Sequence, residues 1–195
     1  MCEDDETSVV AQPVMRVLIL FAGRRRLRSL RQAVEALGAS VVTFEVRDDP
    51  VGQDLGNAGV QASLLQRVEG GEFDAVFLAP PCSSFCLALE PVLRSKQEPE
   101  GMQSVWEEWS GYLGRHNSLV NFSAEVCSAA DRAGAVWMLE NPASRDSGPA
   151  FWARMQHRCL MWDMPRMQRL VAETAAAPVT FAQCQFSSEY QKYTT

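Results

Sequence analysis

Residues 14–23 read VMRVLILFAG, and this stretch decides the fold. The run is short, apolar and rich in β-branched side chains, and it stops at Ala22-Gly23, as a buried central strand of a parallel sheet does. Apolar residues then recur at helical spacing, at Leu27, Leu30, Val34 and Leu37. The sequence therefore predicts a strand followed at once by an amphipathic helix.

The same alternation continues along the chain. Residues 40–46, 74–79 and 135–139 are short apolar runs typical of strands, and residues 60–68 and 119–133 have helical periodicity. Strands that alternate with helices predict an α/β fold, a doubly wound and mostly parallel sheet covered on both faces. Residues 179–186 alternate apolar and polar side chains and are compatible with a further strand.

The length of 195 residues favours one domain. We expect residues 1–13, which are polar and acidic, to be disordered, and residues 14–195 to form a single α/β domain. Residues 91–117 follow a predicted strand without clear periodicity, so they are expected to be an insertion that acts as a lid.

Composition excludes several classes of protein. The net charge of −6 argues against strong sequence-independent attraction to nucleic acid, although the cluster Arg24, Arg25, Arg26, Arg28 and Arg31 permits local contact. Six cysteines without a Cys-x-x-Cys pair, and two histidines, predict neither a metal site nor a disulfide framework. No apolar run approaches the roughly 20 residues that span a bilayer, and no leader is visible, so we expect an intracellular protein, cytoplasmic or nuclear.

Polar or conformationally special residues follow the predicted strands. Ligands of an open α/β sheet bind outside the carboxyl ends of its strands. Gly23 follows the first strand and allows close backbone approach, and Glu45 or Asp48 after the second can accept hydrogen bonds from ribose hydroxyls. The pattern indicates a cofactor that contains a nucleoside, whereas a tight turn alone is the alternative for Gly23.

Residues 79–82, Ala-Pro-Pro-Cys, are more specific. Two prolines stiffen the turn, so they hold Cys82 at the crevice. Enzymes that methylate amino groups precede such a turn with a residue that accepts the amino hydrogens, which Ala79 cannot do. Cys82 is therefore a candidate nucleophile, and a buried thiol in a rigid loop is the alternative.

Glu140 ends an otherwise apolar strand, so its carboxylate must be paired or face a ligand. Hydrogen bonding to backbone amides at a helix start is the structural alternative. A thiol at one strand end could occur by chance, and so could a carboxylate at another. Their occurrence together is less expected by chance and favours a shared function.

Together, residues 21–23 (Phe-Ala-Gly), 80–85 (Pro-Pro-Cys-Ser-Ser-Phe) and 140–142 (Glu-Asn-Pro) resemble the cytosine-5 DNA methyltransferases. The resemblance runs from about residue 14 to residue 142. It implies the class I methyltransferase fold, which is Rossmann-like, the cofactor S-adenosylmethionine and DNA as the substrate. It also implies that Cys82 attacks carbon 6 of cytosine while Glu140 hydrogen-bonds ring nitrogen 3, so that carbon 5 takes the methyl group.

The resemblance assigns further roles by position. Glu45 or Asp48 would hold the ribose and Asp54 would meet the adenine amino group. The remaining cofactor contacts would be Phe21, Ala22, Gly23 and Pro80, and the residues near the substrate would be Pro81, Ser83, Ser84, Phe85, Asn141 and Pro142.

The chain departs from that family in three places. Arg24-Arg25-Arg26 replaces the glycine-rich loop, no Gln-x-Arg-x-Arg motif is present, and about fifty residues follow Pro142, too few for a sizeable target-recognition domain. Two alternatives therefore stay open. One is a catalytically degenerate binding or scaffolding domain that is completed by a partner chain or a missing recognition region. The other is methylation of RNA or of a small molecule on the same fold.

Overall fold

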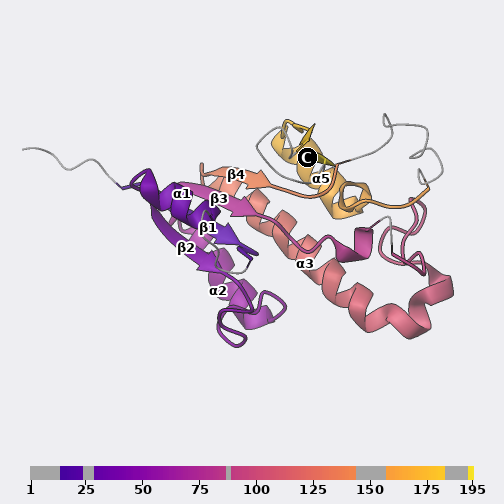
Figure 1. The fold of residues 1–195 in the computed structure, drawn as a ribbon. Helices are drawn as coiled ribbons and strands as arrows, with labels where there is room; N and C mark the ends of the chain where they lie inside the picture. The colour runs from indigo at the N-terminus through magenta and orange to yellow at the C-terminus, as the bar shows by residue number, and fades with distance from the viewer. Residues whose placement is uncertain (1–13, 24–28, 87–88, 144–156, 183–192) are drawn as a thin grey trace, which may run out of the picture.

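A computed structural model of the chain describes residues 14–23, 29–86, 89–143, 157–182 and 193–195 (Figure 1). Two expectations fall outside these ranges, the disorder of residues 1–13 and the basic cluster at Arg24, Arg25, Arg26 and Arg28. Among the described helices, none is long and apolar enough to cross a membrane.

The centre of the molecule is a four-stranded parallel sheet in the order β2-β1-β3-β4. The strands are β1 (Arg16–Leu20), β2 (Ser40–Phe44), β3 (Ala75–Leu78) and β4 (Val136–Leu139). The four strand predictions and the parallel pairing are thus confirmed. The chain first moves outward from β1 to β2 and then returns to place β3 on the other side of β1. Strand order therefore reverses between β1 and β3, which is where an open α/β sheet forms its ligand crevice.

Helices α1 (Leu30–Ala36), α2 (Ala58–Glu69) and α3 (Trp106–Arg132) connect the strands as the alternation predicted. Helix α5 (Pro165–Thr174) follows β4, and the 3-10 turns are η1 (Ser83–Phe85), η2 (Gln103–Val105) and η3 (Met161–Asp163). Ser29 caps α1 and Asn57 caps α2, since the side-chain oxygen of each accepts a backbone N–H of the first turn. Because the direction of travel reverses after β2, right-handed crossovers put α1 on one face of the sheet and α2 and α3 on the other.

The core lies between the sheet and the pair α2 and α3. Alternate residues of the strands, such as Leu18, Val76 and Leu139, pack with Leu64 of α2 and Val120 of α3. Helix α5 extends this core along α3, and Figure 1 shows the two helices side by side. Burial of a large apolar side chain contributes about 1.5–3 kcal/mol, so this layer is the main source of stability.

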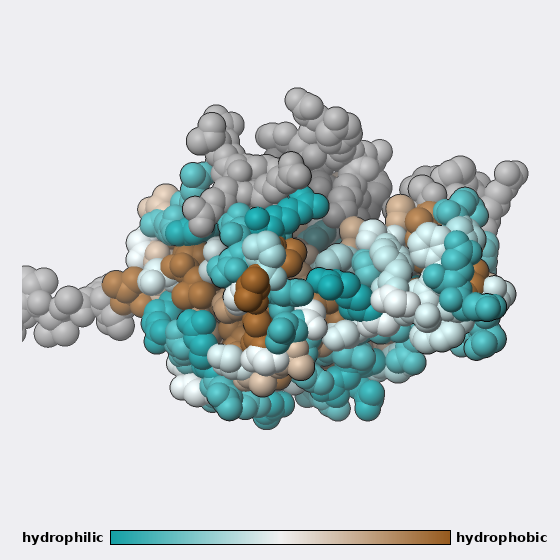
Figure 2. Space-filling view, turned by 90° about the horizontal axis from the view of Figure 1, so that it is seen from below, coloured by the Kyte–Doolittle hydropathy of each residue, from teal (hydrophilic) through white to brown (hydrophobic). Residues whose placement is uncertain are grey.

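The expectation that both faces of the sheet are covered is wrong for β4. Val136 is 71% exposed and Met138 is 61% exposed, and α1 contributes no buried residue. β4 is an edge strand of this sheet, and in the described chain beyond it η3 packs on α5 and α5 packs on α3. Figure 2 shows a group of apolar residues at the surface in the left half of the face that it presents.

Three segments differ from the sequence predictions. The second half of the expected irregular insertion, from Trp106 to Asn117, is the first part of α3, whose buried face includes Leu113, His116 and Val120. Helix α5 was not predicted. The suggested strand at 179–186 contains only β5 (Phe181–Ala182) among described residues, and it pairs antiparallel with β6 (Tyr193–Thr194) in a separate sheet.

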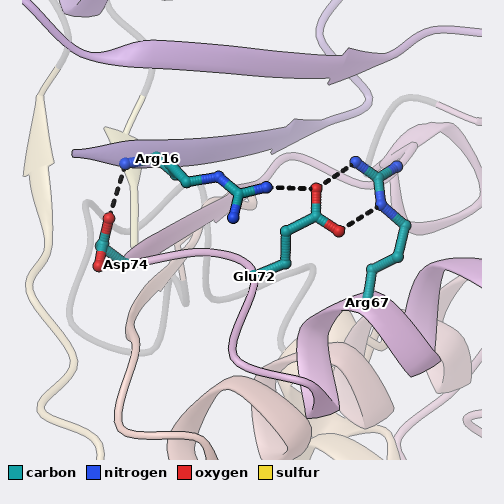
Figure 3. A network of polar contacts seen from close by, with 4 residues as sticks. All are labelled: Arg16, Arg67, Glu72 and Asp74. Atoms are coloured by element: carbon teal, nitrogen blue, oxygen red, sulfur yellow. Dashed lines mark hydrogen bonds and ion pairs between the residues drawn. The ribbon is translucent and has the colours of Figure 1, made fainter. Parts of the chain in front are cut away.

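A polar network stabilises the amino-terminal end of the sheet, where β1 and β3 begin (Figure 3). The Asp74 carboxylate accepts the Arg16 backbone N–H at 2.7 Å, and the Glu72 carboxylate pairs with Arg16 at 2.7 Å and with Arg67 at 2.6 Å. The hydrogen bond from Arg67 lowers the pKa of Glu72. This network fixes the amino ends of β1 and β3.

Candidate functional site

The turn after β1 has an unusual backbone. Phe21 has φ of 57° and Gly23 has φ of 72°, both in the left-handed region. For Phe21 this conformation costs on the order of 1–3 kcal/mol, a strain that clusters at ligand sites. A Cβ built on Gly23 would meet no atom of the described residues within 4 Å, so that part of the chain leaves space beside this turn.

Glu45 closes the turn from the end of β2. Its carboxylate is buried and accepts the backbone N–H of Gly23 at 2.8 Å and that of Arg47 at 3.1 Å. The structure thus brings Gly23 and Glu45 together, and the cofactor contacts that the sequence assigns to them stay predictions. Asp48 lies in the turn beyond it and is exposed. A carboxylate has about four lone-pair positions, so Glu45 retains capacity for further donors.

Asp54 links the loop before α2 to α3. Its Oδ1 accepts the backbone N–H of Gly56 at 2.9 Å and forms an ion pair with Nη2 of Arg115 at 2.9 Å. The side chain of Asp54 is 25% exposed, so a ligand can reach it only beside this existing ion pair. Its assignment to an adenine amino group stays a prediction.

The loop after β3 holds Cys82 at the carboxyl end of the sheet. Ala79 donates its N–H to the carbonyl of Leu20, and Pro80 is buried. Cys82 directly precedes η1, and its carbonyl accepts the N–H of Phe85 at 3.0 Å. The Cys82 side chain is half-buried. The alternative of a thiol sealed in the core therefore does not apply.

Two side chains, Tyr112 and Arg94, fix the residues that follow Cys82. The Tyr112 hydroxyl donates to Oγ of Ser83 at 2.9 Å, and Nε of Arg94 donates to Oγ of Ser84 at 3.3 Å. The Arg94 guanidinium also stacks on the ring of Phe85, 4.3 Å from its centroid. Ser84 and Phe85 are buried, whereas Pro81 and Ser83 are exposed. Of the expected substrate residues in this loop, Pro81 and Ser83 are accessible.

Glu140 directly follows β4, and its N–H donates to the carbonyl of Leu78 at 2.8 Å. Its side chain is half-buried, and its carboxylate accepts a hydrogen bond from the Thr194 hydroxyl. The chain brings Thr194 here because Pro142 and Thr194 form an antiparallel bridge and Asn141 exchanges two backbone hydrogen bonds of 3.0 Å with Thr195. Glu140 is thus oriented by residues distant in sequence.

Asn141 joins the two halves of the candidate site. It is 1% exposed, and its Nδ2 donates to the carbonyl of Pro80 at 3.1 Å. Since Leu78 and Leu139 are paired in register, Ala79 and Glu140 occupy adjacent positions, about 4.8 Å apart. The structure therefore brings the Cys82 loop and Glu140 together, and it gives Asn141 a structural role. Pro142 is half-buried, and its carbonyl accepts the indole N–H of Trp162 at 3.0 Å.

The sequence analysis missed Arg94, Tyr112 and Thr194. Arg94 stands after the apolar pair Val92-Leu93, and a charged residue so placed was the available signal. Tyr112 lies in the segment expected to be irregular. Nothing local distinguishes Thr194, because its role comes from pairing with a strand end more than fifty residues earlier.

Among the described residues, no group of three His, Cys, Asp or Glu side chains gathers as metal ligands would. Comparisons with protein-family models, with curated proteins and with solved structures give no match for this chain. The functional argument therefore depends on the geometry at the carboxyl ends of β1, β3 and β4.

Proposed function

We propose that the chain is a class I methyltransferase that uses S-adenosylmethionine to methylate carbon 5 of cytosine in DNA. The observation that carries the proposal is the 3.1 Å bond from Asn141 to Pro80, which holds the Cys82 loop against the strand end of Glu140. A half-buried thiol and a half-buried carboxylate then lie at the ligand crevice of a parallel sheet. This pair of groups suits nucleophilic attack on an electron-poor ring.

The residues at the turn after β1 fit a nucleoside-containing cofactor. Gly23 leaves open space, and Glu45 lies beside it as an acceptor for ribose hydroxyls. Phe21, Ala22 and Pro80 would flank the cofactor, and Asp54 would accept from its adenine amino group. When bound, S-adenosylmethionine supplies the methyl group.

The chain's own residues prepare the cytosine. The thiolate of Cys82 adds to carbon 6, a hydrogen bond between Glu140 and ring nitrogen 3 stabilises the charge that develops on the ring, and carbon 5 becomes nucleophilic. Thr194 donates to Oε1 of Glu140 and so orients this carboxylate. Solvent water then takes the proton from carbon 5, the electron pair left there re-forms the double bond to carbon 6, and the Sγ–carbon 6 bond breaks to restore the thiolate.

A methyl-transfer assay tests the reaction. The protein is incubated with methyl-labelled S-adenosylmethionine and with DNA duplex, single-stranded DNA or RNA of one sequence. We expect label at carbon 5 of cytosine in DNA, lost in Cys82→Ser and retained in Cys86→Ser, whose thiol is exposed four residues further on. Label in RNA alone would mean that the substrate is RNA instead of DNA. No label in any nucleic acid would overturn the proposal.

Calorimetry tests the cofactor site separately. Removing the Glu45 charge weakens hydrogen bonds to ribose hydroxyls, so Glu45→Gln should lower the affinity for S-adenosylmethionine about tenfold. Asp49→Asn is the matched control, because Asp49 is an exposed acid of the same loop whose Oδ1 accepts backbone N–H groups. Equal affinities in both variants would remove Glu45 from the site.

A second candidate function is a non-catalytic binding domain. The observation that favours it is the exposure of Val136 and Met138 on β4, since apolar surface on a sheet often marks a contact with another molecule. This candidate predicts that Cys82→Ser changes nothing measurable and that S-adenosylmethionine binds weakly or is not bound.

A further inference from the structure

We propose that Tyr112 is a positioning residue for the thiol of Cys82, because its hydroxyl holds Ser83 and so fixes the backbone that carries the thiol; this inference rests on the proposed function. The Tyr112 hydroxyl donates to Oγ of Ser83 at 2.9 Å, and Ser83 directly follows Cys82. A nucleophile must be held close to its attack geometry, since a displacement of about 1 Å can slow a reaction about a hundredfold. A hydrogen bond to the adjacent residue therefore influences the reaction without contact to the substrate.

The turn that carries Cys82 is short. η1 has only three residues, and the N–H of Phe85 donates to the carbonyl of Cys82 at 3.0 Å while that of Cys86 donates to the carbonyl of Ser83 at 3.2 Å. Hydrogen bonds of a 3-10 turn have poorer geometry than those of an α-helix, so the backbone bonds alone hold such a turn weakly. Side-chain contacts of η1 therefore decide how firmly Cys82 is held.

The two serines of the turn are bonded on two different sides. Ser84 is 3% exposed, and its Oγ accepts a hydrogen bond from Nε of Arg94 at 3.3 Å. Ser83 is exposed, and its Oγ accepts from Tyr112. Arg94 therefore anchors the turn to the interior, and Tyr112 anchors its solvent-facing side.

Packing fixes Tyr112 itself. It lies in the first part of α3, which runs beside η1 (Figure 1). Its ring makes an edge contact with Trp109, with centroids 5.8 Å apart, and a tilted contact with His116 at 4.3 Å. His116 and Leu113 of the same helix are buried, so this part of α3 is packed on the protein interior. The hydroxyl is thus presented to Ser83 by a side chain whose ring is already held, as a preorganised support requires.

Alkylation of Cys82 tests the proposal without methyl transfer. Tyr112→Phe removes the hydroxyl and keeps the ring contacts, and Ser83→Ala removes the acceptor. Loss of this hydrogen bond should make local opening of the turn, and so the reaction of Cys82 with iodoacetamide, about three- to tenfold faster. Cys86 is already exposed and should react at an unchanged rate. Continued protection of the buried Cys127 would show that the whole protein has not unfolded.

A double variant assigns the effect to the bond. Tyr112→Phe combined with Ser83→Ala should react no faster than either single variant, because both changes remove the same interaction. Ser83→Thr keeps a hydroxyl and should restore the rate of the wild type. Ser104→Ala is the matched control, since Ser104 is an exposed serine of η2, and it should behave as the wild type does. Additive effects of the two changes, or a rate at Cys82 that neither change alters, would overturn the proposal.

Steady-state kinetics then connect the position of the thiol to the reaction. Tyr112→Phe should lower kcat for methyl transfer about tenfold and leave KM for S-adenosylmethionine unchanged, because the proposed cofactor contacts lie mainly after β1 and β2. An unchanged kcat would contradict a positioning role even if alkylation were faster. Absence of methyl transfer in the wild type, with alkylation of Cys82 that still depends on Tyr112, would remove the proposed reaction and keep Tyr112 as the residue that positions the thiol.

Discussion

Nδ2 of Asn141 lies 3.1 Å from the carbonyl oxygen of Pro80, and this bond connects two strand ends that are 61 residues apart in sequence. Cys82 follows Pro80 by two residues, and Glu140 directly precedes Asn141. One buried amide therefore holds the Cys82 loop next to the strand end that carries Glu140. It also explains why an asparagine stands after the glutamate without requiring that it contact a base.

Asn141→Ala removes this connection. It leaves the carbonyl of Pro80 buried without its donor, so the free energy of unfolding should fall by about 1–3 kcal/mol, measured by urea denaturation. Val68→Ala, on the buried face of α2, should cost about 2 kcal/mol and serves as a control. Methyl transfer should fall in Asn141→Ala and persist in Val68→Ala. Equal activities would show that the bond does not position Cys82.

Thr194→Val removes the hydroxyl that donates to Glu140 while it retains the shape of the side chain. A hydrogen bond to a charged group contributes about 1.5–3 kcal/mol, so the variant should be less stable by that amount, whereas Thr194→Ser should be close to the wild type. Hydrogen exchange of the Asn141 and Thr195 amides reports the same change. Similar exchange in all three proteins would contradict the assigned orientation of Glu140.

The thiols differ in burial, so their alkylation rates should differ. Cys86 is exposed and Cys82 half-buried, whereas burial raises the pKa of Cys127 and raises the pKa of Cys159 to about 12. At a pH of about 8.5, iodoacetamide should modify Cys82 and Cys86 in the folded protein and spare the other two. Peptide mass spectrometry gives the order in which the four cysteines are alkylated. Protection of Cys82 equal to that of Cys127 would mean that the thiol is not accessible.

His116 makes stability depend on pH. Burial, with the nearby charges of Arg94 and Arg115, lowers the pKa of His116 to about 4, from an ordinary value of 6.5. The unfolded chain therefore binds the proton more readily, and stability is complete above pH 6.5 and is lost as the pH falls toward 4. The loss amounts to about 3 kcal/mol.

Comparison of the wild type with His116→Phe isolates this contribution. The variant keeps a ring beside Tyr112, whose centroid is 4.3 Å from that of His116, and it cannot titrate. Urea denaturation should show a smaller loss of stability in the variant between pH 6.5 and 4. The stabilisation from Glu72, whose pKa is also lowered, is lost only as the pH falls below its ordinary value of 4.5, and this loss is common to both proteins. Parallel pH profiles would contradict the assignment.

The sheet could be predicted because its strands carry local signals. β1 and β3 are apolar on both faces, as central parallel strands must be, and each ends at glycine or proline. The first half of α3 was missed because Trp109, Gly111 and Gly114 weaken its helical pattern. Packing of Leu113 and Val120 against the core outweighs that propensity, and such contacts are not visible in a local window.

The candidate site was predicted only in part for the same reason. Cys82, Glu140, Gly23 and Glu45 lie within four residues of the carboxyl end of a strand, so parallel topology alone brings them to one edge. Arg94 and Thr194 reach the site through long loops and an antiparallel bridge, and their roles depend on partners far away in sequence. Residue spacing carries no signal for such contacts.

Covalent trapping tests the central claim most directly, namely that Cys82 and Glu140 act on the same base. A DNA duplex with 5-fluorocytosine blocks loss of the substituent at carbon 5, so a cytosine attacked by the thiol stays attached after methyl transfer. In the presence of S-adenosylmethionine we predict an adduct at Cys82 by mass spectrometry, slowed in Glu140→Gln and absent in Cys82→Ser. No adduct at Cys82 while the protein binds both cofactor and duplex would contradict the account.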